Sequence, residues 1–204
     1  MDNEVTIVGN TIDFPVYSHE FLGKSYYVCS VKTTYLRRNE LNASVIRVYI
    51  PEEIAISVFL SPKTVIKIKG SIVNSTHDGH KDISVVADSV ELTDEPFANQ
   101  AKLTGVITRV FTNDDNFVNF VNFLISLPNK NNQKRSVSLR VVAWAKLADY
   151  IYNNLKLGDK ITVIGALSSS IFDPSREGSC LDTSEKVIIN ELYCTECAKV
   201  SENA

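Results

Sequence analysis

The chain of 204 residues contains two copies of one sequence pattern, about 95 residues apart. Five pairs of segments match in the same order: 5–9 with 101–105, 29–31 with 125–127, 46–48 with 139–141, 65–70 with 160–165, and 91–92 with 191–192. Five ordered matches at nearly constant spacing indicate a duplicated domain. We therefore expect an N-terminal domain over 1–95, a C-terminal domain over 96–193 and a short tail over 194–204.

Within each copy the hydrophobic pattern predicts mainly strands. In the first copy, alternation of apolar and polar residues predicts strands at 5–12, 25–35, 43–50, 65–73 and 82–92. Pro51 followed by Glu52 and Glu53 predicts a short helix, because proline suits the first helical position and carboxylates there complement the helix dipole. The second copy predicts a longer helix over 145–156 that ends before Gly158.

A helix between the third and fourth strands of a five-stranded unit predicts the fold class. This order is typical of the OB-fold barrel, so we expect an all-β chain of two tandem five-stranded OB-fold barrels. Another small all-β barrel is the alternative, which the position of the helix disfavours.

Composition excludes several classes of protein. Four cysteines in 204 residues are too few for a disulfide scaffold, and no apolar run approaches the ~18 residues of a membrane span. Residues 1–4 lack the pattern of a signal peptide, so we expect a cytoplasmic protein without membrane association. A net charge of −3 also excludes a polycation that coats nucleic acid by bulk charge.

Positive charge is nevertheless concentrated in corresponding strands of the two copies. Residues 21–50 carry a net charge of +4 and residues 116–146 carry +5, so the rest of the chain sums to −12. These segments hold the second and third predicted strands of each copy. A cationic surface that repeats in register is typical of a polyanion site, and OB folds bind oligonucleotides on these strands.

Strand alternation predicts which side chains on this surface face outward. They are Tyr26 and Lys32 on strand two of the first copy, Arg47 and Tyr49 on its strand three, and Arg140, Val142 and Trp144 on strand three of the second copy. Outward rings can stack on bases while cations neutralise phosphates, without dependence on base sequence. The alternative for Trp144 is a half-buried anchor for the helix that follows it.

Part of the second copy resembles a known family. Residues 139–148, with Trp144 before the predicted helix, and residues 155–167 resemble the bacterial single-stranded DNA-binding proteins. The first copy is more remote: its residues 17–20, followed by Tyr26 and Tyr27, resemble a divergent branch of that family and the related primosomal replication protein N. The match of the second copy to the single-stranded DNA-binding proteins covers about residues 99–192.

The resemblance implies roles for individual residues. Trp144 and Phe172 fall where the family keeps base-stacking aromatic residues, and Arg140 falls on a position that is commonly basic. The chain also departs from the family pattern: Ser138 replaces a stacking tryptophan, and residues 168–170 are serines in place of a basic run. The family's flexible tail with an acidic tip is missing too, which implies weaker DNA binding and no recruitment through a tail.

Metal binding and catalysis receive little support. His77 with His80, and Cys194 with Cys197, each have the spacing of half a zinc site, but a closed site needs four converging ligands and the pairs lie in different copies. We expect a turn at the first pair, a reduced tail at the second, and no metal or cofactor. His19 beside Glu20 is expected to make hydrogen bonds in a loop. The chain has no phosphate-binding glycine loop or nucleophile motif, so we expect no enzyme.

The sequence therefore predicts a protein that binds single-stranded DNA with little sequence preference, in replication, recombination or repair. The residues predicted to stack on bases are Tyr26, Tyr49, Trp144 and Phe172, and those predicted to contact phosphates are Lys32, Arg37, Arg38, Arg47, Lys130, Lys134, Arg135 and Arg140. Two chains are expected to pair, which presents four barrels. The alternative is an OB-fold interaction module that docks a replication or primosome protein; an oligosaccharide-binding domain would have aromatic residues without the basic excess.

Overall fold

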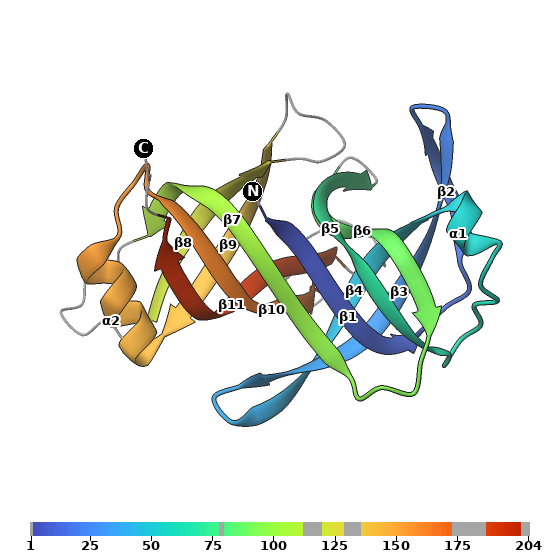
Figure 1. Cartoon of the computed structure of the whole chain (residues 1–204), viewed down its shortest axis with the longest axis horizontal. Coiled ribbons are helices and arrows are strands. Elements are labelled where there is room, and N and C mark those ends of the chain that lie inside the picture. The colour runs from blue at the N-terminus through green and yellow to red at the C-terminus, as the bar shows by residue number, and fades with distance from the viewer. Residues whose placement is uncertain (1, 78–79, 112–119, 129–135, 173–186, 201–204) are drawn as a thin grey trace, which may run out of the picture.

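We describe the protein from a computed structural model, which describes residues 2–77, 80–111, 120–128, 136–172 and 187–200. Figure 1 shows two β-barrels side by side, one built from each half of the chain. Both predicted helices are present, as α1 (Glu52–Ala55) and α2 (Ala145–Asn154). Among the described residues, no helix is long and apolar enough to cross a membrane.

The first barrel is closed by five strands. They are β1 (Asn3–Thr11), β3 (Lys24–Arg37), β4 (Glu40–Pro51), β5 (Val65–His77) and β6 (His80–Leu92). Neighbouring strands pair around the barrel in the order β1, β3, β4, β6, β5 and back to β1, and only β4 and β6 run parallel. Helix α1 follows β4 and precedes β5, as expected for an OB fold.

The second barrel repeats this order. Its strands are β7 (Ala98–Phe111), β8 (Phe120–Pro128), β9 (Ser136–Trp144), β10 (Lys160–Phe172) and β11 (Val187–Lys199), with α2 between β9 and β10. They pair in the order β7, β8, β9, β11, β10 and back to β7, again with one parallel pair, β9 with β11. The predicted all-β class with two OB-fold barrels is confirmed.

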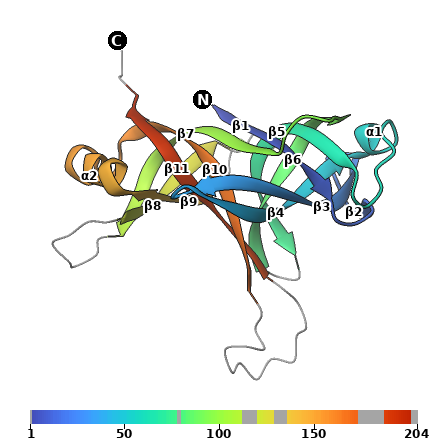
Figure 2. The ribbon, with the colours of Figure 1, turned by 90° about the horizontal axis from the view of Figure 1, so that it is seen from below.

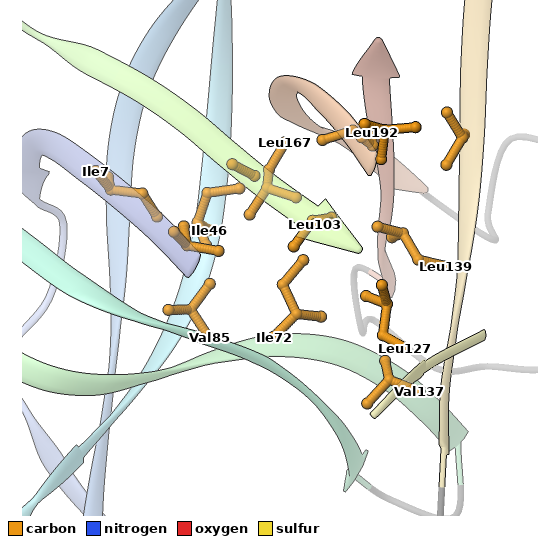
Figure 3. Packing of buried hydrophobic residues seen from close by; sticks show 14 of the residues in the cluster. Ile7, Ile46, Ile72, Val85, Leu103, Leu127, Val137, Leu139, Leu167 and Leu192 are labelled. Atoms are coloured by element: carbon orange, nitrogen blue, oxygen red, sulfur yellow. The ribbon is translucent and has the colours of Figure 1, made fainter. Parts of the chain in front are cut away.

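The barrels join through their first strands. β1 and β7 pair antiparallel, and Val5 lies opposite Ala101, its counterpart in the repeat. A residue that pairs with its own counterpart marks a local two-fold axis, the arrangement of an isologous interface within one chain. One buried cluster runs through this seam: Ile72 of the first barrel lies near Leu103 and Leu127 of the second (Figure 3).

Repeated glycines explain part of the sequence pattern. A Cβ atom at Gly70 or at Gly165 would lie well inside 3.0 Å of a carbonyl oxygen on the neighbouring strand, that of Val86 or Tyr193. The strand register shifts at both glycines, because the partner strand carries one extra residue there, Asp88 on β6 and Thr195 on β11. Each glycine thus lies opposite a β-bulge, where two backbones approach too closely for a side chain.

The structure corrects the alignment of one strand. The sequence pattern pairs residues 29–31 with 125–127, whereas the barrels superpose Val31 on Ile125, because these residues pair with Thr11 and Ile107 at the same place in each first strand. The shift is two residues. Since side chains alternate with a period of two, the predicted inward and outward faces are unchanged.

Two further expectations about chain ends and loops are wrong. Residues 194–199 do not form a tail, because they continue β11 against β10 as far as Lys199. His19 and Glu20 do not lie in a loop, because they belong to an additional strand, β2 (Val16–Phe21), which pairs with β3. All six residues of β2 are exposed, so the alternation that identifies half-buried strands is absent there.

Candidate nucleic-acid interface

Equivalent arginines lie on the outer wall of the two barrels. Arg47 on β4 pairs with Ser30 on β3, and Arg140 on β9 pairs with Leu124 on β8, at the corresponding place in the second barrel. Their neighbours Val48 and Val141 are fully buried, so the arginines face away from the barrel interiors. Lys32 lies on the same outer face as Arg47, next to Ser30 along β3, and is exposed.

The tyrosines predicted to stack on bases are covered. Tyr26 and Tyr49 point outward from the first barrel, but they are only 8% and 4% exposed and pack with Val73 and Val86 in a small cluster. His19 of β2 covers them: its ring stacks on Tyr26 with centroids 5.4 Å apart and contacts Tyr49 edge-on at 5.3 Å. The expectation that these two rings are open to bases is wrong, because the unpredicted strand β2 lies over them.

The hairpin of β3 and β4 reaches from the first barrel onto the second (Figure 2). The Tyr35 hydroxyl lies 2.8 Å from Oγ of Ser168, and the backbone N–H of Val45 donates to Oγ of Ser169 at 2.7 Å. Ser44 and Ser169 also join through their hydroxyls, 3.0 Å apart. Ser168 and Ser169 replace the basic run of the family that the sequence resembles, and here they accommodate the hairpin.

The tip of this hairpin lies over aromatic residues of the second barrel. The Arg38 guanidinium lies 3.6 Å from the centre of the Trp144 ring. Arg37 lies between Trp144 and Tyr193, 5.5 and 5.7 Å from their ring centres. Phe120 packs against Trp144 from β8, with ring centroids 4.9 Å apart. We call these five residues the arginine–aromatic cluster.

Trp144 has the position expected for the second of the two roles considered for it, the helix anchor. It is half-buried against Phe120 and immediately precedes α2, as an anchor for that helix would be. Its indole nitrogen is buried without a hydrogen-bond partner in the described part of the chain. Arg38 lies over one face of the ring and Phe120 packs against it, so the hairpin in this position takes the place that a stacked base would occupy over that face.

The sequence could not identify Tyr193 and Phe120 as members of this cluster. Tyr193 follows the fully buried Leu192 on β11, so alternation alone places it outward. Phe120 is the first residue of β8, opposite Trp144. What the sequence lacks is a signal that a hairpin from the other barrel ends above them.

Several predicted site residues lie outside the described residues. Lys130, Lys134 and Arg135, between β8 and β9 in the sequence, are three of them. Phe172 ends β10, but its side chain is not described. The side chains of His77 and His80 are not described either; their backbones pair in the register of β5 and β6.

Cys194 and Cys197, the other half of the candidate zinc site, are thiols within a strand of the second barrel. Cys194 and Cys197 lie on β11, and burial raises their pKa values to about 12 and about 11. Metal ligation requires the thiolate, which such burial disfavours. Among the described residues, no three His, Cys, Asp or Glu side chains gather in a way that could hold a metal ion.

Comparison with known proteins identifies the architecture. No protein-family model and no curated protein sequence matches the chain. The single-stranded DNA-binding protein from Thermus aquaticus superposes with a TM-score of 0.75 at 17% identity, over 99% of this chain and 94% of that one. This chain has the same fold. A deletion mutant of the Thermus protein gives the same TM-score at 18% identity, over 99% of this chain and 96% of that one.

The N-terminal domain of PriB from Thermoanaerobacter tencongensis is a more distant match. It superposes with a TM-score of 0.38 at 22% identity, over 46% of this chain and 98% of that domain. The resemblance seen in the sequence is thus confirmed at the level of the fold, over both barrels, by the Thermus protein.

Proposed function

We propose that the protein binds single-stranded DNA with little sequence preference, along the outer wall of both barrels. The observation that carries this proposal is the pair Arg47 and Arg140, outward cations at equivalent positions of two OB barrels. Structural requirements of the core do not explain a repeated outward arginine, whereas a polyanion that crosses both barrels does. The fold shared with the Thermus single-stranded DNA-binding protein supports the same reading.

The cations would act on the phosphate backbone. Lys32, Arg47, Arg140 and Arg37 would contact phosphates, together with Lys130, Lys134 and Arg135 of the β8–β9 connection. Phosphate contacts carry no base information, so such binding is tolerant of sequence and weakens as salt increases. The proposed role is to protect or organise unpaired strands in replication, recombination or repair in the cytoplasm, without catalysis.

We also propose that two chains pair and present four barrels. The seam between β1 and β7 already gives each chain a two-barrel unit with a local two-fold axis, and homo-oligomers extend such units by closed symmetry. Light scattering would then give about twice the 22.7 kDa of one chain. A monomer at all concentrations would contradict the pairing and leave the DNA-binding proposal intact.

Comparison of single-stranded and double-stranded DNA tests the function. We would titrate labelled oligo-thymidine and a duplex of the same length with the protein and follow fluorescence anisotropy. We expect at least tenfold tighter binding of the single strand, and weaker binding by Arg47→Ala with Arg140→Ala than by wild type. A docking module for a replication protein would bind neither DNA, and that result would overturn the proposal.

A further inference from the structure

The arginine–aromatic cluster contains two features that cost free energy. Arg38 has φ of 52° and Asn39 has φ of 65°, so they form a two-residue turn in which both central residues are left-handed. This conformation favours glycine and asparagine, and an arginine there is uncommon. The buried indole nitrogen of Trp144 also lacks an acceptor among the described residues. Such costs concentrate at functional sites.

The strained turn has a specific geometric result. It directs Arg38 onto the Trp144 ring at 3.6 Å, while Arg38 itself stays exposed. The guanidinium is planar, and one of its faces is in contact with the indole. Arg38 as a whole remains exposed, and a planar group with a ring on one side can take a second stacked ring only on its other face.

An exposed guanidinium plane backed by an aromatic ring suits one kind of ligand. Unpaired bases stack on arginine planes as they do on aromatic rings, and cation–π contact with the indole holds the guanidinium in place. Arg37, close to both Trp144 and Tyr193, adds positive charge beside this plane.

We infer that Arg38 and Trp144 form a composite stacking site between the two barrels, in which the Arg38 guanidinium receives an unpaired base and Trp144 supports it from behind. This inference rests on the proposed function and assigns Arg38 a role different from a phosphate contact. Neither barrel contains the site alone, because the turn belongs to the first and the indole to the second.

Two substitutions distinguish stacking on the planar Arg38 guanidinium from attraction by its positive charge. Arg38→Lys keeps the charge and removes the plane, whereas Arg38→Ala removes both. With oligo-thymidine as the probe, we expect both variants to bind roughly tenfold more weakly than wild type, in the range of one stacked base. The control, Arg109→Lys, makes the same exchange at an exposed arginine of β7 that has no part in the proposed contacts, and it should change the affinity by less than about twofold. Unfolding by urea would verify that each variant is folded.

Tryptophan emission gives an independent measurement, since Trp144 is the only tryptophan. In the wild type the guanidinium separates base from indole, so saturating oligo-thymidine should quench emission only partly. Arg38→Ala opens the indole to the base, and its quenching at saturation should be stronger. If the wild type is already fully quenched and Arg38→Ala is the same, the base stacks directly on Trp144 and the inference is wrong.

The outcomes also distinguish this inference from the proposed function. If Arg38→Lys binds like wild type, Arg38 is a phosphate contact; if Arg38→Ala binds more tightly, Arg38 is a cover over Trp144. Either result overturns the composite site and leaves DNA binding standing. If the wild type binds no oligo-thymidine, both proposals fail.

Discussion

At the scale of single residues, burial separates the tyrosines that stabilise the fold from those that contact solvent. Tyr49 is an outward residue by alternation, yet it is 4% exposed beneath His19 and packs with Tyr26. Its surroundings resemble a small second core on the outside of the barrel. A buried ring of this kind contributes to stability rather than to binding.

We therefore expect Tyr49→Ala to lower the free energy of unfolding by about 3 kcal/mol, the usual cost of removing a buried aromatic ring. Tyr17→Ala is the matched control, because Tyr17 is 59% exposed on β2 and its loss should cost less than about 1 kcal/mol. Urea denaturation followed by circular dichroism measures both values. Equal small losses would show that Tyr49 is accessible in solution.

At the scale of strands, the close backbone contacts at the repeated glycines predict that a side chain there destabilises the fold. Gly165→Ala should lower the free energy of unfolding by at least about 2 kcal/mol, because the new Cβ would meet the carbonyl oxygen of Tyr193. Gly23→Ala is the control: nothing lies within 4 Å of its Cβ, and only its φ of +72° opposes a side chain, at a cost of about 1 kcal/mol. Thermal unfolding of the two variants checks that Gly165→Ala is the more destabilising substitution.

If Gly23→Ala proved the more destabilising substitution, the bulge at Gly165 would not be as tight as the structure shows. Gly70→Ala offers a second test in the other barrel, where a Cβ at Gly70 would meet the carbonyl oxygen of Val86. The two substitutions should have similar effects, since the local geometry repeats.

The sequence predicts the strands that alternate in burial and fails where burial does not alternate. The strands of the first barrel follow from periodicity, since each has one face in a core, and those of the second barrel follow from the repeat. The first helix follows from Pro51 with its two carboxylates, and the second from its apolar face. Strand β2 has no buried face, and β11 extends past Cys194 through pairing with β10. Neither feature has a local signal.

The candidate site shows the same division. Periodicity correctly places Arg47, Arg140 and Lys32 on the outer wall, because facing depends only on strand parity. It cannot show that His19 covers Tyr26, or that the turn at Arg38 lies on Trp144. The first contact involves a strand that the sequence does not predict, and the second joins residues far apart in the sequence. Only the tertiary structure shows them.

At the scale of the molecule, the two barrels share one core. Buried residues of both barrels form a single cluster that runs through the β1–β7 seam, and β3–β4 adds hydrogen bonds from Tyr35 and Val45 to the second barrel. We therefore expect one cooperative unfolding transition for the whole chain, with calorimetric and van't Hoff enthalpies that agree. Two separate transitions would mean that the barrels unfold independently.

In the proposed complex, phosphates lie along cations on both barrels, and the salt dependence of binding measures these contacts. Each neutralised phosphate of a single strand contributes about −0.7 to the slope of log K against log salt, so Lys32, Arg37, Arg47 and Arg140 alone predict about −3. Arg47→Ala combined with Arg140→Ala should reduce the magnitude of this slope by about 1.4. If the affinity for oligo-thymidine does not change between low and high salt, the cations of the two barrels do not bind the phosphates.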